Sequence, residues 1–240
     1  MNPTATAADP AAALARRRYR LGARMFTAAV RWLRWWLLAA LVLAVLGGPL
    51  IHLIWGADAG AWTGTISVLQ WFTAITGGVF LHSSLTGLIS RGVTRREITV
   101  AFLVFGALAS AALAALAVTG FAVEHFMLGL VAAPDDTWGQ VLAKGARYLL
   151  IGPAYFFAGA LVTAAAARIG KEGAFVVVLF LLFPSMLIAG TLSLEFFGYT
   201  VDAFSWRAAA WIGSGLAFIA AMVTALVLVL RSVPVPKRGG

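Results

Sequence analysis

Six long apolar segments constrain this chain more than any other feature. Each is a nearly unbroken run of Leu, Val, Ile, Ala and Phe, apolar all round rather than along one stripe. About 20 such residues form a helix that crosses the roughly 30 Å hydrocarbon core of a bilayer. The segments are residues 35–55, 66–90, 98–121, 148–167, 174–192 and 208–230.

The composition excludes a soluble domain. Hydrophobic residues make up 62% of the chain and charged residues 11%, whereas soluble domains are about half apolar and about a quarter charged. The short alternating segments of a membrane β-barrel are absent. We therefore expect an all-α, polytopic membrane protein with six transmembrane helices. The lack of cysteine also excludes disulfides and cysteine-ligated metals.

The charges predict an orientation. The net charge is +9, and with the N-terminus inside, fifteen of the eighteen Lys and Arg residues fall on the cytoplasmic side. The three on the other side are Lys144, Arg147 and Arg207. This asymmetry follows the positive-inside rule for six spans with both termini cytoplasmic. The basicity is thus explained by topology, without a nucleic-acid partner. Trp62 and Trp138 are expected at the outer interface.

A basic helix precedes the first span. Its arginines recur at helical spacing on one face, and Leu21, Met25 and Ala29 lie on another. Such a helix lies in the headgroup plane, where anionic membrane lipids attract it. A cleaved signal peptide fits poorly, because the charged region is too long. The expected domains are a tail and interfacial helix (1–34), a six-helix domain (35–230) and a cytoplasmic tail (231–240).

The cytoplasmic turn between the second and third spans carries the clearest motif. It reads Ser-Arg-Gly-Val-Thr-Arg-Arg-Glu-Ile over residues 90–98. Gly92 can adopt the positive φ that ends a helix, and Thr94 with Glu97 forms a capping box for the next one. Two interpretations are open: a capped loop that only obeys the positive-inside rule, or a docking site for a cytoplasmic partner.

With these features the chain resembles the permease subunits of type-2 ATP-binding-cassette exporters, which move polysaccharides, lipid-linked polymers, peptide antibiotics and drugs. In that family the interfacial helix and the second-to-third-span turn press on the ATPase subunit, the turn acting as a coupling helix. The resemblance assigns ATPase coupling to Gly92, Thr94, Arg95, Arg96 and Glu97. The amphipathic segment 193–206 resembles the re-entrant outer element before the family's last helix.

The resemblance implies that ATP and Mg are bound by a partner subunit. The chain has no phosphate-binding loop, and its nearest approach, at residues 170–172, lacks the required glycine and hydroxyl. We therefore expect no cofactor in this chain, a separate ATPase subunit, and a second permease copy, identical or not. The implied location is a bacterial cell (cytoplasmic) membrane. The expected cargo is a lipophilic or amphipathic drug, peptide antibiotic or lipid-like molecule.

Two other functions are alternatives. A substrate-binding membrane subunit of a vitamin importer also has six spans, but would not need the basic helix or the arginine-rich turn. An intramembrane protease would need a serine or zinc motif. The sequence Gly213-Ser214-Gly215 lacks the further upstream glycine that the serine-protease motif requires, and no histidine follows His125. Glu124 and His125 are adjacent but do not form a zinc-binding motif. We expect no catalytic residue and no metal.

Ionisable residues at membrane depth are candidates for a substrate path. These are His82 in the second span, Glu124 and His125 just beyond the third, and Glu195 in segment 193–206. For His82 the alternative is an imidazole that bonds a neighbouring helix. For Glu124 and His125 the alternative is a solvated outer loop. Separately, Pro153 and Pro184 are expected to break or kink their helices. Small residues at 164–167 and 213–215 would allow close helix approach.

Overall fold

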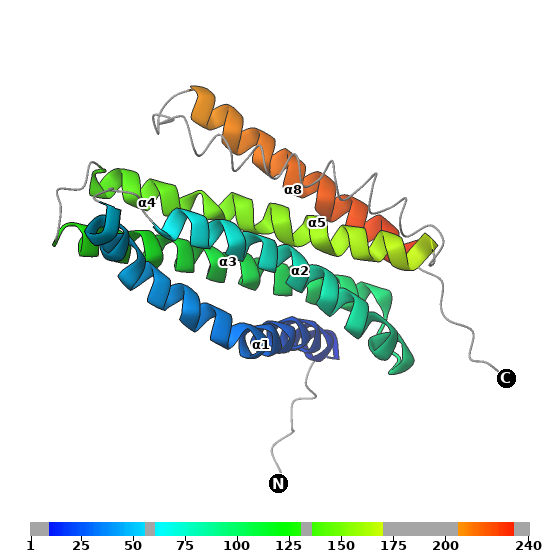
Figure 1. Cartoon of the computed structure of the whole chain (residues 1–240). Helices are drawn as coiled ribbons and strands as arrows, with labels where there is room; N and C mark the ends of the chain where they lie inside the picture. Colours follow the sequence, from blue (N-terminus) through cyan, green and yellow to red (C-terminus); the bar gives the residue numbers. More distant parts are fainter. Residues whose placement is uncertain (1–9, 56–60, 131–135, 170–205, 233–240) are drawn as a thin grey trace, which may run out of the picture.

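The computed structural model describes residues 10–55, 61–130, 136–169 and 206–232. This part of the chain is helical and contains no strand. Its helices run roughly side by side (Figure 1). They are α1 (Pro10–Trp55), α2 (Ala61–Ser90), α3 (Arg95–Leu128), α4 (Trp138–Ala146), α5 (Tyr148–Ile169) and α8 (Trp206–Ser232). The all-α prediction is confirmed for these residues.

Five helical stretches are long and apolar enough to cross a membrane. They are Arg17–Gly47, Ala61–Ser90, Arg95–Leu128, Trp138–Ile169 and Ala208–Ser232. Large apolar side chains are exposed along α1, α2 and α8, as in helices that face lipid. The helices therefore indicate a multi-pass membrane protein. The expected fifth span (174–192), with Pro184, and the segment 193–205 lie outside the described residues.

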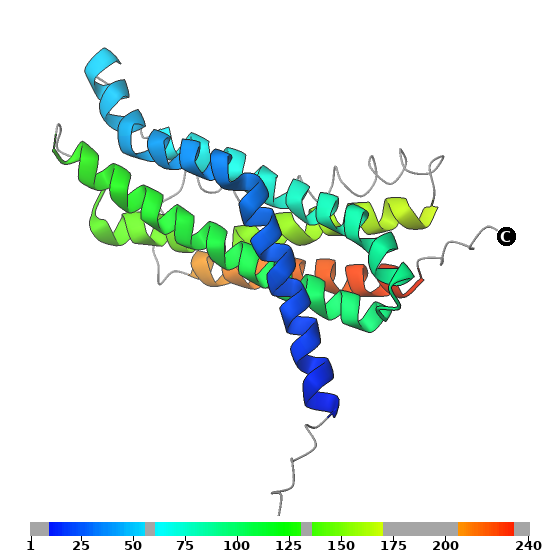
Figure 2. The same cartoon turned by 90° about the horizontal axis from the view of Figure 1, so that it is seen from below.

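The first helix runs across the expected domain boundary at residue 34. α1 is one helix of 46 residues, so the expected interfacial helix and first span are continuous. Residues 30–37 contain no Gly or Pro, and nothing there breaks the helix. Figure 2 shows that α1 bends: its N-terminal half lies across the other helices, and its later half runs along them. A Cβ at Gly22 would lie 2.6 Å from the backbone oxygen of Ala101, so α1 touches α3 closely there.

Two other expected boundaries shift. α2 begins at Ala61 rather than residue 66, and α3 extends to Leu128 rather than residue 121. α5 continues through Pro153, where a break or kink was expected. This proline is the sixth residue of α5, so its missing N–H removes one hydrogen bond near the helix start. The buried residues around it keep the helix in place.

Two apolar clusters form the interior. One, towards the 90–94 turn, joins residues of α1, α2, α3, α5 and α8 around Phe102, Phe105 and Phe156. The rings of Phe105 and Phe156 meet edge to face with centroids 5.0 Å apart. The other, towards the opposite end, surrounds Trp62 and Tyr155. Most of α5 is buried, so it is the central helix of the described bundle.

Glycines bring α2 and α5 into backbone contact. A Cβ at Gly159 would lie 2.1 Å from the backbone oxygen of Ala74, and one at Gly77 would lie 2.6 Å from that of Phe156. Small residues at such a seam let helices in a membrane approach closely. Of the runs singled out in the sequence, Ala164 and Ala165 are buried, whereas Gly213 faces open space.

Candidate functional site

The turn between α2 and α3 begins with a glycine-based helix end. Gly92 has φ +75°, in the left-handed region that favours glycine. Its N–H donates to the carbonyl of Ile89 at 3.0 Å, and the N–H of Val93 donates to that of Leu88 at 3.1 Å. These two bonds form a Schellman motif. Val93 and Leu88 both pack on the apolar cluster nearest the turn, so α2 ends in a fixed geometry.

The capping box predicted for the start of α3 is confirmed. The N–H of Glu97 donates to the hydroxyl of Thr94 at 3.3 Å, and the N–H of Thr94 donates to Glu97 Oε2 at 2.9 Å. The Thr94 hydroxyl also donates to Oε2 at 3.0 Å. Glu97 is only 6% exposed. Its carboxylate is therefore part of the turn itself, and both ends of the turn are closed by hydrogen bonds.

The arginines of the turn have different surroundings. Arg91 and Arg96 are exposed. Arg95 is half-buried, and its guanidinium donates to the backbone carbonyl of Arg231, at the C-terminal end of α8. A cation there satisfies a helix-end carbonyl and complements the helix dipole. Of the two arginines expected to meet a partner together, Arg96 is the more accessible, while Arg95 binds α8.

The basic part of α1 approaches the same turn. Arg17 and Arg18 lie close enough to Glu97 for their positive charges to act on its carboxylate. Arg18 is half-buried, and its Nε is buried without a hydrogen-bond partner. The turn is thus flanked by α1 and joined to the end of α8, in addition to connecting α2 and α3.

His82 lies far from the other two described candidates for a substrate path, Glu124 and His125. His82 is exposed on α2, beside the fully buried Leu81. Twenty residues of the same helix separate it from Trp62, which contacts Glu124, a distance of about 30 Å at 1.5 Å per residue. His125 lies edge to face with Trp138, with ring centroids 4.5 Å apart. Glu195 lies outside the described residues.

Glu124 holds the start of α2. Its side chain is 5% exposed and accepts the backbone N–H of Trp62 at 2.8 Å. Trp62, expected at the outer interface, is the second residue of α2 and is fully buried by the protein; its indole N–H donates to the carbonyl of Ala117 at 3.3 Å. Gly120 leaves room for the indole, since a Cβ there would lie 2.0 Å from its ring. Glu124 therefore caps a helix.

A buried polar pair between α2 and α5 was missed by the sequence analysis. Gln70 Nε2 donates to the hydroxyl of Tyr155 at 3.2 Å, and Gln70 is 4% exposed. Gln70 Oε1 and the hydroxyl of Ser110 are buried without a hydrogen-bond partner. The available signal was Gln70 itself, the single amide side chain in the second expected span.

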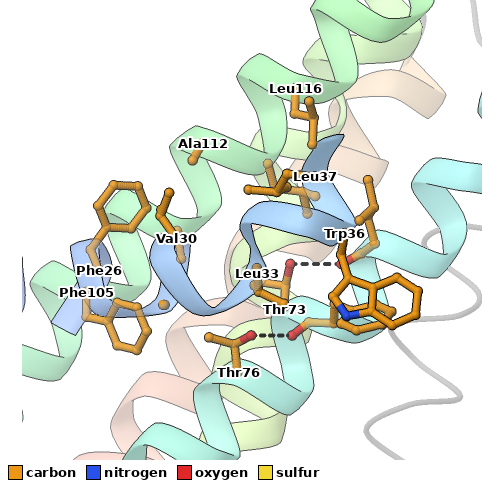
Figure 3. Close-up of a pocket in the computed structure, with 15 residues that line it drawn as sticks. Phe26, Val30, Leu33, Trp36, Leu37, Thr73, Thr76, Phe105, Ala112 and Leu116 are labelled. Atoms are coloured by element: carbon orange, nitrogen blue, oxygen red, sulfur yellow. Dashed lines mark hydrogen bonds between the residues drawn. The ribbon is translucent and has the colours of Figure 1, made fainter. Parts of the chain in front are cut away.

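A groove between α1, α2 and α3 was also missed (Figure 3). It encloses about 380 Å³ and is lined almost entirely by apolar side chains. Its lining comes from three helices, and no single segment marks it in the sequence. We call it the α1–α2–α3 groove. Within the described residues, no cluster of three His, Asp or Glu side chains could hold a metal ion.

Comparison of the chain with protein-family models, with curated proteins and with solved structures finds no match.

Proposed function

We propose that this chain is the membrane-spanning permease subunit of an ATP-driven exporter whose ATPase is a separate subunit. The turn at residues 90–97 and the basic first part of α1 are the surfaces that the ATPase contacts. Two permease copies, in a bacterial cell membrane, move a lipophilic or amphipathic substrate out of the cytoplasm. The resemblance in span layout and turn sequence suggests this class of protein.

The proposal rests mainly on the hydrogen bonds that close both ends of the turn. A segment that receives force must not unwind under load. Gly92 closes the end of α2, and Thr94 with Glu97 closes the start of α3. The hydrogen bond from Arg95 to Arg231 ties the turn to α8 as well. A push on this turn would therefore reach three membrane-spanning helices.

The contact itself is assigned to the accessible arginines. Arg91 and Arg96 are exposed beside the closed turn. A guanidinium can bind a carboxylate through two parallel hydrogen bonds, which makes arginine well suited to an acidic partner surface. In this proposal Arg96 meets the ATPase, while Arg95 keeps the turn attached to α8.

The proposal is tested by purifying the tagged chain from its native host in mild detergent and assaying the preparation for ATP hydrolysis. We expect an ATPase subunit to co-purify, and Arg96→Ala, alone or with Arg91→Ala, to reduce its recovery without reducing membrane insertion. Arg168→Ala is the matched control, because Arg168 is an exposed basic residue at the end of α5. Purification without ATPase activity, or equal recovery with all variants, would contradict the proposal.

Direction of transport separates exporter from importer. Inside-out vesicles containing the complex should accumulate a lipophilic fluorescent dye when ATP is added. Accumulation of a vitamin in right-side-out vesicles instead would favour the importer.

A further inference from the structure

Two polar atoms in the interior of the bundle are buried without a hydrogen-bond partner. They are Oε1 of Gln70 on α2 and the hydroxyl oxygen of Ser110 on α3. Each of these side chains is only 4% exposed, so neither atom reaches bulk solvent. A polar group buried in an apolar environment costs free energy unless it is hydrogen-bonded, and unpaired groups of this kind are rare in folded proteins. The two atoms therefore need a partner that the helices do not supply.

The hydroxyl of Ser110 differs from other buried hydroxyls of the bundle. Serine and threonine in a helix commonly bond the backbone carbonyl one turn earlier. The hydroxyl of Thr73 donates in this way to the carbonyl of Leu69 at 3.1 Å, and that of Thr76 to the carbonyl of Phe72 at 2.7 Å. Ser110 makes no such bond. Its hydroxyl can therefore donate to a partner outside α3.

Gln70 and Ser110 lie at the same level of the bundle. The residues just before them, Leu69 on α2 and Ala109 on α3, both line the α1–α2–α3 groove. Gln70 and Ser110 do not line the groove. Both instead meet α5, on the inner side of α2 and α3.

The two side chains meet the same turn of α5. Gln70 Nε2 donates to the hydroxyl of Tyr155 at 3.2 Å. A Cβ at Gly152 would lie 3.3 Å from Cα and 3.4 Å from Cβ of Ser110. Gly152 and Tyr155 are three residues apart and thus lie on one face of α5, and a helical side chain leans over the turn that precedes it. The two unpartnered atoms therefore flank one turn of α5.

The chemistry of the two atoms is complementary to water. The amide Oε1 of Gln70 only accepts hydrogen bonds, whereas the hydroxyl of Ser110 can donate one. A water molecule between them would donate one hydrogen to Oε1 and accept the hydrogen of the hydroxyl. Buried waters make two to four such bonds to polar groups that lack other partners. Both groups are neutral, which favours a neutral ligand over an ion.

We propose that a single water molecule is bound between α2, α3 and α5, where it donates to Gln70 Oε1 and accepts from the hydroxyl of Ser110. The water joins α3 to the α2–α5 pair through two hydrogen bonds, beside the hydroxyl of Tyr155. The site depends on neither the ATPase nor the transported substrate, so it is tested apart from the proposed function.

Radiolytic labelling of the full chain in detergent tests for the water. X-ray pulses convert bound water into hydroxyl radicals, which modify the side chains next to it, and mass spectrometry locates the products. Tyr155 is 1% exposed, so bulk water should not label it. We expect Tyr155 to be labelled in the unaltered protein, and this labelling to be lost in Ser110→Ala and in Gln70→Leu.

Thr76→Val is the matched control for the loss of a buried hydroxyl. Thr76 is 3% exposed, and its hydroxyl is already bonded within α2, so labelling of Tyr155 should be unchanged in this variant. Phe102, fully buried in the apolar cluster nearest the turn, should stay unlabelled throughout. An unlabelled Tyr155 in the unaltered protein, or labelling that persists in Ser110→Ala, would overturn the proposal.

A double-mutant cycle distinguishes a water bridge from a direct bond. Gln70→Leu and Ser110→Ala should shift the midpoint of SDS unfolding non-additively, because both remove the same ligand. Gln70→Leu and Thr76→Val should be additive, since six residues of α2, about 9 Å at 1.5 Å per residue, separate the two positions. Additive effects at Gln70 and Ser110 would overturn the water site. Non-additive effects without labelling of Tyr155 would show a direct bond between the two side chains, and would overturn it as well.

Discussion

The backbone N–H of Trp62 donates to Oε1 of Glu124 at 2.8 Å, which joins the first turn of α2 to the last turns of α3. The first N–H groups of a helix have no partner within it, so a buried helix start needs an acceptor from elsewhere. Glu124 supplies that acceptor across 62 residues of sequence.

We expect Glu124→Ala to destabilise the protein by about 1–3 kcal/mol, because it leaves the buried N–H of Trp62 without an acceptor. Glu124→Gln keeps one acceptor oxygen and should cost less. The free energy of unfolding can be measured by SDS titration in mixed micelles. Thr119→Ala is the control, since Thr119 is exposed on the same helix. Equal stability of the Ala and Gln variants would contradict a capping role.

Replacing a glycine by alanine should have opposite effects on stability at the α2–α5 seam and on the open side of α8. Gly159→Ala should cost about 1–3 kcal/mol, because the new methyl group would collide with the backbone of Ala74. Gly213→Ala should be neutral or stabilising by up to about 1 kcal/mol, since Gly213 is helical and has open space around it. Thermal unfolding in detergent compares the two. Similar melting temperatures for both variants would argue against backbone contact at this seam.

The bond from Arg95 to Arg231 predicts a local effect at the end of α8. Arg95→Ala should speed hydrogen exchange of the amides near residues 228–232 by about two- to tenfold, the range expected for one lost hydrogen bond. Arg96→Ala, at the neighbouring exposed position, should leave this exchange unchanged. Exchange measured by mass spectrometry on the intact protein in detergent distinguishes the two arginines. Identical exchange in both variants would remove the role assigned to Arg95.

The buried pair of Gln70 and Tyr155 can be measured by a double-mutant cycle. Gln70→Leu, Tyr155→Phe and the double variant should give a coupling energy of about 0.6 kcal/mol, the average for side-chain hydrogen bonds within membrane proteins. SDS titration supplies the four free energies of unfolding. A coupling energy of zero would mean that the 3.2 Å contact contributes nothing to stability.

Local patterns were the predictable part of this structure. The bonds of Thr94 with Glu97, and the positive φ of Gly92, involve neighbours in sequence, so the residue types alone indicate them. The apolar runs likewise predicted α5 and α8 to within two residues at each end, whereas α2 begins five residues earlier and α3 ends seven residues later than expected. The basic stretch ends near residue 34, but α1 continues through that point, because a change of charge does not interrupt a helix.

Contacts between distant segments were not predictable. Glu124 lies just past an apolar run, which suggested a substrate path or a solvated outer loop, but its acceptor role depends on where α2 begins. A glycine in the sequence also does not show by itself that two helices touch at that position. Gly159 meets Ala74 because the two helices cross there, while Gly213 points away from the bundle. The α1–α2–α3 groove arises only when three helices are placed together.

The glycine seam also limits how this molecule can change shape. With the backbone of α5 pressed against that of α2 at Gly159 and Gly77, neither helix can slide or rotate without a steric collision. We therefore expect α2 and α5 to move together as one rigid unit. Any rearrangement must therefore be taken up at its flanks, by α1 with its bend and by α8, whose long sides are largely exposed.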